Sequence, residues 1–103
     1  MKIAIVGAGK LGLRVIESMI TGGNSITVID KDEELLERLA TQMDVMTIAG
    51  NAKSASFLRE HNIGSYDFLV AVTGNDEKNI VIASFAKALG CSKVIARLRD
   101  PEH

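Results

Sequence analysis

The first thirty residues carry a pattern that very few folds accommodate. A short apolar run over residues 3–6 leads into the hexapeptide Gly7–Gly12, whose glycines have the spacing G-x-G-x-x-G. A helical pattern follows, and a second apolar run over residues 26–29 ends at Asp30. Strand, glycine turn, helix, strand and acidic residue, in this order, form the complete fingerprint of a dinucleotide-binding βαβ unit. The pattern predicts a nucleotide ligand and leaves open what the binding is for.

Strands and helices alternate along the whole chain. The apolar runs predict strands over residues 3–6, 26–29, 45–48, 68–72 and 94–96. Helical spacing predicts helices over residues 10–21, 53–60 and 76–89, and a further helix whose apolar face runs from Leu35 to Met43. Because right-handed crossovers join parallel strands, we expect a Rossmann-like, doubly wound α/β fold with strand order 3-2-1-4-5 and helices on both faces.

The sixth strand that is customary in this fold has no counterpart in the sequence. The last apolar run is followed by Pro101, which marks the end of regular structure. We therefore expect residues 1–103 to form a single nucleotide-binding lobe, which is the N-terminal part of a longer domain.

Composition argues against several classes of protein. A net charge of −1 and only four aromatic residues indicate that nucleic acid is not a partner. Cys91 is the only cysteine, so neither a disulfide framework nor a CxxC metal site is expected. No apolar stretch approaches the roughly 20 residues of a membrane span, and the first apolar run is too short for a signal peptide. We expect a cytoplasmic protein without a metal site.

Each glycine of the hexapeptide has a separate expected role. Gly7 allows the tight turn out of the first strand, and Gly9 lets a pyrophosphate approach the backbone. Gly12 lets the following helix pack closely against the strand. The free N–H groups at the start of this helix would then bind phosphate, helped by the helix dipole. The alternative is that the glycines only make a turn.

Lys10 lies in the first turn of this helix, where a cation opposes the helix dipole by about 0.3–1 kcal/mol. A bound phosphate would reverse the sign of that contribution, which makes Lys10 a candidate phosphate ligand. An exposed lysine that is screened by solvent explains the same position equally well.

Asp30 stands at the C-terminal tip of the second predicted strand. A carboxylate there accepts hydrogen bonds from the adenosine ribose and repels a 2′-phosphate, which favours NAD over NADP; the neighbouring Lys31 is a slight counterweight. The same carboxylate suits ATP, ADP or AMP. Asp30 and Glu33 also fit a capping box for the next helix, which is a purely structural alternative.

Three further segments follow strands on the ligand side of the predicted sheet. Asn51, followed by Ala52, could bond the adenine edge or cap the next helix. Thr73 and Gly74 lie across the switch point from the first strand, where they could border the ligand or form an ordinary strand-to-helix turn. Arg97 ends the fifth strand, where it could reach a distal phosphate or remain on the surface.

The second half of the chain resembles one family in three segments. They are Thr73–Asn79 (TGNDEKN), Ala86–Gly90 (AKALG) and Ile95–Glu102 (IARLRDPE). Along essentially its whole length the chain resembles the regulator-of-potassium-conductance family, the TrkA-type nucleotide-binding (KTN) domains of potassium channels and transporters. The resemblance implies a regulatory subunit that binds NAD(H) or ATP/ADP and passes its conformation to a membrane potassium pore.

The same resemblance assigns roles to matching positions. It implies that the three glycines hold phosphate, that Asp30 holds the ribose, and that Thr73 and Gly74 line the site. The chain departs from the family at two places: the family often has arginine at the position of Lys10, and it usually has Gly-Asp-Ala at residues 50–52. The predicted cofactor-binding residues are Gly7, Ala8, Gly9, Lys10, Leu11, Gly12, Asp30, Lys31, Asn51, Ala52, Thr73, Gly74 and Arg97.

The expected helix over residues 76–89 is apolar nearly all round. One stripe can pack on the sheet, and the remainder needs another cover. A C-terminal segment of the same chain or a partner subunit could supply it. The family resemblance implies a homodimer or a larger ring, held at the inner face of the cell membrane through a potassium channel or transporter subunit.

The competing interpretation is the cofactor-binding fragment of an NAD-dependent oxidoreductase. Such an enzyme needs an acid–base residue beside the nicotinamide. His61 is expected in a loop far from the first strand, His103 lies in the tail, and Cys91 lacks an apparent activating neighbour. Asp76 and Glu77 open a helix, where the dipole stabilises acids. We therefore expect no catalytic residue and no enzymatic activity.

Overall fold

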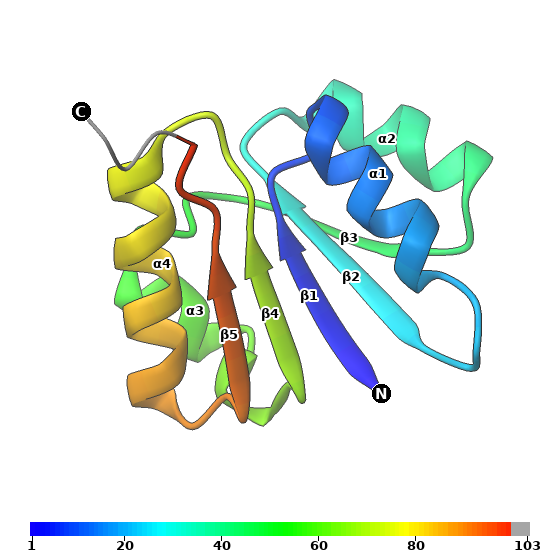
Figure 1. Ribbon diagram of the computed structural model, residues 1–103. Coiled ribbons are helices and arrows are strands. Elements are labelled where there is room, and N and C mark those ends of the chain that lie inside the picture. The colour runs from blue at the N-terminus through cyan, green and yellow to red at the C-terminus, as the bar shows by residue number, and fades with distance from the viewer. Residues whose placement is uncertain (100–103) are drawn as a thin grey trace.

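A computed structural model describes residues 1–99, and residues 100–103, which include Pro101 and His103, lie outside the described part. The strands are β1 (Lys2–Val6), β2 (Ser25–Asp30), β3 (Met46–Ala49), β4 (Phe68–Ala71) and β5 (Lys93–Ala96). The helices are α1 (Lys10–Met19), α2 (Glu33–Gln42), α3 (Ala55–Glu60) and α4 (Asp76–Leu89), with a 3₁₀ turn at Ile63–Ser65. The predicted alternation is confirmed (Figure 1). Within residues 1–99, no helix is both long and apolar enough to cross a membrane.

The strands form one parallel sheet of order β3-β2-β1-β4-β5, as predicted. β1 lies at its centre, and Ile5 pairs with Val28 on one side and with Val70 on the other. The run Ile3–Val6 is buried throughout. A strand covered on both faces has no solvent side, which explains why this run is apolar without alternation.

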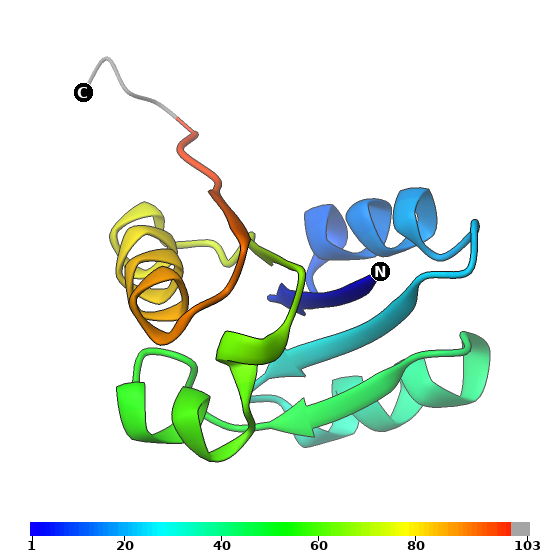
Figure 2. The same cartoon turned by 90° about the horizontal axis from the view of Figure 1, so that it is seen from below.

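The helices cover both faces of the sheet. Figure 2 shows α1 and α2 on one side of the strands and α3 and α4 on the other. Successive side chains of β1 therefore enter different cores. Ile3 and Ile5 pack with residues of α1 and α2, whereas Ala4 and Val6 pack with residues of α3 and α4. This arrangement confirms the doubly wound α/β fold.

Several element boundaries differ from the prediction by one or two residues. The helix predicted to reach residue 21 ends at Met19, because the Asn24 side chain donates to the Met19 carbonyl oxygen and closes the helix there. The helix predicted from residue 53 begins at Ala55, because Ser54 accepts a backbone N–H of its first turn. Local side-chain hydrogen bonds, rather than apolar spacing, decide these ends.

The connections after β1 and β4 leave the sheet in opposite directions (Figure 1). The first enters α1 on one face of the sheet, and the second enters α4 on the other. Open α/β sheets bind ligands at such a switch point, outside the carboxyl ends of the strands. The fold therefore places the glycine turn and the β4–α4 connection on opposite sides of one crevice.

Candidate nucleotide-binding site

A cavity of about 180 Å³ lies at this switch point. The glycine turn, the ends of β2 and β4, the segment after β3 and the first turns of α4 form its walls. Its lining residues are Val6, Gly7, Ala8, Gly9, Ile29, Asp30, Lys31, Gly50, Ala52, Val72, Thr73, Gly74, Lys78 and Ile82. The structure thus brings together predicted residues that are far apart in the chain.

A second hollow adjoins this cavity. It is lined by Gly9, Lys10, Leu11, Arg14, Val72, Gly74 and Arg97. Three of these residues are cations and none is acidic, so the hollow presents positive charge beside the N-terminus of α1, where the helix dipole adds to it. The two hollows share Gly9, Val72 and Gly74, so one ligand can extend from the first into the second.

Close backbone contacts build the glycine turn. Gly7 has a φ of 110°, which glycine adopts without strain, and its N–H donates to the Ile29 carbonyl oxygen at 2.9 Å. A Cβ on Gly12 would overlap the Gly7 carbonyl oxygen, so α1 packs directly on the turn. Gly9 differs from both, because its φ is −75° and a Cβ there would meet nothing within 4 Å in the described part of the chain. Packing gives no reason for glycine at position 9, which lines both hollows.

The carboxylate of Asp30 is held against the glycine turn. Its Oδ2 accepts the Ala8 N–H at 2.9 Å, and its Oδ1 accepts the Asp32 N–H at 2.9 Å. The capping-box alternative for Asp30 is wrong, because Asp32 caps α2 by accepting the Leu35 N–H at 3.1 Å. Each carboxylate oxygen of Asp30 retains acceptor capacity, which a ribose hydroxyl can use.

Lys31 and Lys78 line the cavity together with Asp30. The neighbouring Lys31 lowers the pKa of Lys78, and partial burial and the charge of Lys53 act in the same direction. The positive charges of Lys31 and Lys53 thus disfavour the charged form of Lys78, whereas the negative charge of Asp30 favours it. An anionic group of a ligand would likewise favour the charged form.

The segment after β3 contributes differently from the prediction. Gly50 and Ala52 line the cavity, whereas Asn51 is exposed and is not part of the lining. The Asn51 Oδ1 accepts the Lys53 N–H at 3.0 Å. The capping alternative for Asn51 is wrong, because Ser54 is the N-cap of α3. Its adenine contact stays a prediction.

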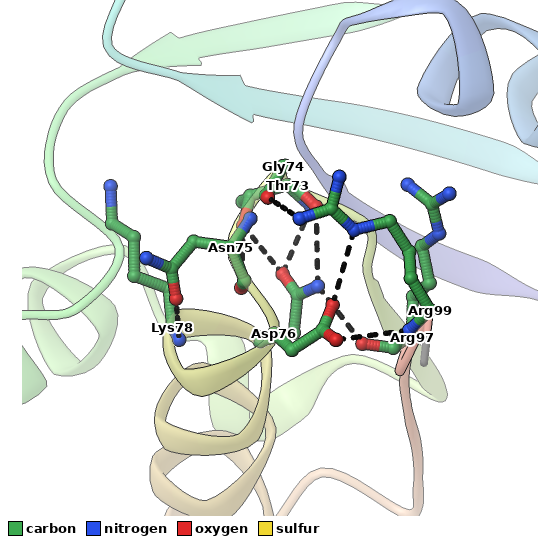
Figure 3. A network of polar contacts seen from close by, with 8 residues as sticks. Thr73, Gly74, Asn75, Asp76, Lys78, Arg97 and Arg99 are labelled. Atoms are coloured by element: carbon green, nitrogen blue, oxygen red, sulfur yellow. Dashed lines mark hydrogen bonds and ion pairs between the residues drawn. The ribbon is translucent and has the colours of Figure 1, made fainter. Parts of the chain in front are cut away.

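Thr73 and Gly74 line the cavity from the β4–α4 connection, and Figure 3 shows both residues beside the start of α4. Polar contacts order this connection. The Thr73 N–H donates to the Oδ1 of Asn79 at 2.9 Å, and Asn75 caps α4 by accepting the Lys78 N–H at 2.9 Å. The two alternatives for Thr73 and Gly74 are therefore compatible: these residues form the strand-to-helix turn and also line the cavity.

Sequence reasoning missed three residues with polar or charged side chains here: Arg14, Lys78 and Asn79. Arg14 follows Lys10 by four residues, which places both on one face of a helix, so the sequence did carry a signal for it. Asn79 is a polar residue on the otherwise apolar buried face of α4, which is also visible in the sequence. Lys78 becomes a wall residue only because α4 starts at the crevice.

His61 and Cys91 lie outside both hollows. His61 follows α3 and packs against Phe57, with 4.6 Å between ring centroids. Burial raises the pKa of the Cys91 thiol, which keeps it protonated at neutral pH. Within residues 1–99, no group of histidine, cysteine, aspartate and glutamate is arranged to hold a metal ion.

Relatives share this sequence over its whole length. The family model described as the TrkA-N domain matches residues 3–103. The Trk system potassium uptake protein TrkA homolog of Methanothermobacter thermautotrophicus is 35% identical over 103 residues, which cover 100% of this chain and 48% of that protein. The Trk system potassium uptake protein TrkA of Vibrio alginolyticus is 35% identical over 104 residues, covering 100% of this chain and 23% of that protein. The chain thus spans half or less of the length of these relatives.

Solved structures share the fold at lower identity. The NAD(P)-binding domain of an exopolyphosphatase-related protein from Archaeoglobus fulgidus has a TM-score of 0.83 at 18% identity, covering 97% of this chain and 74% of that one. The Kef CTD of Shewanella denitrificans in AMP-bound form has a TM-score of 0.75 at 18% identity, covering 92% of this chain and 57% of that one. These likenesses establish the fold alone. The full-length family match and the relatives at 35% identity show more: the chain belongs to the TrkA-N domain family.

Proposed function

We propose that this chain is a nucleotide-sensing regulatory lobe of a potassium channel or a Trk- or Ktr-type transporter, and that it binds NAD(H) or ATP/ADP. The observation that carries the proposal is the pair of hollows that adjoin at Gly9. The first contains the Asp30 carboxylate, and the second gathers three cations. An adenosine diphosphate group is complementary to both, because its ribose hydroxyls donate to a carboxylate and its phosphates bind cations.

In this proposal the adenosine occupies the first hollow, with ribose hydroxyls donating to Asp30. The diphosphate crosses Gly9 and accepts hydrogen bonds from the N–H groups at the start of α1. Lys10, Arg14 and Arg97 surround it in the second hollow. This placement explains why glycine stands at a position where packing does not require it.

Membership in the TrkA-N family and the names of the relatives support a role in potassium uptake. We propose that residues 1–103 are the N-terminal lobe of a longer domain, since those relatives extend well beyond the matched region. The lobe would lie at the cytoplasmic face of the membrane and pass its nucleotide state to a potassium channel or transporter subunit.

Thermal denaturation with NADH, NAD, ATP, ADP, AMP and NADPH tests nucleotide binding. A ligand at about 100 times its Kd should add about 2.7 kcal/mol to the free energy of unfolding. For a chain of this size, that corresponds to a rise in Tm of about 11–22 °C. No shift with any adenine nucleotide would contradict the proposal. Hydride transfer from NADH to a small substrate would favour the oxidoreductase alternative instead.

Asp30→Asn should raise the affinity for NADPH relative to NADH by about tenfold. The substitution removes the charge that repels a 2′-phosphate, whereas Lys31 and Lys78 stay in the cavity wall. A tenfold change is about 1.4 kcal/mol, a reasonable size for one charge interaction near a protein surface. Isothermal titration calorimetry with both cofactors measures the ratio.

The matched control is Asp32→Asn, which removes a neighbouring charge at the α2 cap, outside the cavity lining. It should leave the NADPH to NADH ratio unchanged. A ratio that also stays unchanged in Asp30→Asn would show that Asp30 does not face the 2′ position of the ribose.

We also propose that a second copy of the chain covers the outer face of α4 and β5. Ile80 is 47% exposed there. A shallow groove on this face is lined by Ile80, Ala83, Ser84, Lys87, Ala88, Val94 and Ala96. Exposed apolar residues gathered along one groove are typical of an interaction surface.

Ile80→Glu should weaken self-association about tenfold or more, because burying an isoleucine contributes about 1.5–3 kcal/mol. Sedimentation equilibrium of the assembled protein measures the change. Met46→Glu is the control, since Met46 is 64% exposed on β3, at the opposite edge of the sheet. An equal effect of both substitutions would contradict an interface at α4.

The oxidoreductase alternative finds little support in the described residues. A nicotinamide would extend into the second hollow, whose lining in residues 1–99 holds no histidine, cysteine or carboxylate. Acid–base catalysis beside the nicotinamide would need such a group within hydrogen-bonding reach. We therefore propose a sensor rather than an enzyme.

A further inference from the structure

One buried side chain joins the cavity wall to the segment that follows β5. Asn79, in the first turn of α4, is 0% exposed. Its amide nitrogen donates to the carbonyl oxygens of Thr73 at 3.2 Å and Arg97 at 3.1 Å. Its Oδ1 accepts the N–H of Thr73 at 2.9 Å and the hydroxyl of Thr73 at 2.6 Å. The full hydrogen-bonding capacity of the amide is used.

A polar side chain at this position needs a physical reason. The other buried residues of α4 are apolar, and burying an amide is costly unless all of its polar atoms are bonded. Helix capping does not supply the reason, because Asn75 already caps α4. The contact that an apolar residue could not make is the bridge from Thr73 to Arg97.

A second set of contacts joins the same two segments on the surface (Figure 3). The Asp76 Oδ2 accepts the Arg99 N–H at 3.0 Å, and the Arg99 guanidinium donates to the Gly74 carbonyl oxygen at 2.7 Å. The Arg99 Nε lies 3.6 Å from the Asp76 Oδ1. A partly exposed ion pair of this kind contributes little stability, but it fastens residues 97–99 against the cavity wall.

We propose that Asn79 is a positioning residue for the nucleotide, aligning Thr73 at the first hollow with Arg97 at the second. The inference rests on the proposed nucleotide binding and adds the residue that couples the two ends of the ligand. A ligand that spans both hollows touches both segments that Asn79 joins. Nucleotide occupancy is thereby transmitted to residues 97–99, through which the chain leaves the sheet.

The test compares AMP with ADP in Asn79→Asp. Aspartate keeps an acceptor for Thr73 but cannot donate to the Arg97 carbonyl oxygen. AMP fits the first hollow, whereas the β-phosphate of ADP extends toward the second, so Arg97 should affect ADP more than AMP. By titration calorimetry, we expect the preference for ADP over AMP to fall about tenfold in Asn79→Asp and in Arg97→Ala. The double variant should show no further loss of preference.

Tyr66→Phe is the matched control, because it removes a buried hydrogen bond to Thr27, 3.0 Å long, outside both hollows. It should lower thermal stability and leave the preference for ADP unchanged. Equal weakening of ADP and AMP in Asn79→Asp would make Asn79 merely structural and overturn the proposal. No binding of any adenine nucleotide by the unmutated chain would overturn the proposed function itself, and this inference with it.

Hydrogen exchange on the unmutated chain tests the same coupling without depending on whether a variant folds. ADP should slow the exchange of backbone amides in residues 73–79 and 97–99 together. AMP should protect residues 73–79 more than residues 97–99. Protection by ADP that is confined to residues 73–79 would overturn the proposal.

Discussion

Gly12→Ala should lower the free energy of unfolding by about 3 kcal/mol and abolish nucleotide binding. The added Cβ would overlap the Gly7 carbonyl oxygen and lie 2.9 Å from the Gly7 carbonyl carbon. Because these are backbone atoms, no rotamer change relieves the overlap, and α1 must shift away from the turn. For a chain of this size, the loss corresponds to a fall in Tm of about 12–24 °C, measured by circular dichroism.

A Tm within about 3 °C of the unmutated chain would show that α1 does not pack on the turn as described. The matched control is the same substitution at Gly9. It adds the same methyl group to the same turn, but nothing lies within 4 Å of the added Cβ in residues 1–99.

Gly9→Ala should weaken nucleotide binding about 100-fold, or about 2.7 kcal/mol, with little change in stability. Gly9 lines both hollows, so a methyl group there occupies the space through which the proposed diphosphate passes. Two small effects on folding oppose each other. Alanine is a poorer N-cap than glycine, which lowers stability by less than about 1 kcal/mol. It also reduces the conformational entropy of the unfolded chain, which raises stability by less than about 1 kcal/mol.

Calorimetry with ADP measures the effect of Gly9→Ala on binding, and thermal unfolding of the free protein measures its effect on stability. If Gly9→Ala bound ADP as tightly as the unmutated chain does, the ligand would not pass over Gly9. A loss of stability as large as that of Gly12→Ala would mean that the space at Gly9 is not open. The two substitutions, three positions apart, should therefore reduce nucleotide binding for different reasons: Gly12→Ala by disrupting the fold and Gly9→Ala by blocking the ligand.

The order of the sheet could be predicted because it follows from patterns that are local in the chain. The buried run Ile3–Val6 indicates a central strand, and the alternation of strands with helices, combined with right-handed crossovers, leaves few topologies. The bounds of α4 were predicted as observed, since the helical pattern starts at Asp76 and Gly90 ends it. Each of these signals lies inside the element that it specifies or directly next to it in the sequence.

The helix caps could not be predicted as well, because neighbouring residues have the same chemistry. Asp30 and Asp32 can both cap α2, and the choice depends on the Ala8 N–H, which engages the Asp30 carboxylate from 22 residues away. Asn51 and Ser54 stand in the same relation to α3, which Ser54 caps. A single sequence gives no means of ranking such competitors.

Local sequence was sufficient for the parallel sheet, its strand order and the position of the glycine turn. The strands and the glycine turn depend on residues that are close together in the chain, and the strand order follows from the alternation of strands with helices through the right-handed crossover rule. The meeting of Lys10 and Arg14 with Arg97, and the bridge that Asn79 makes between Thr73 and Arg97, depend on the tertiary structure. These contacts exist only once α1 and α4 have packed on opposite faces of the sheet, and no local pattern specifies that packing at the level of single atoms.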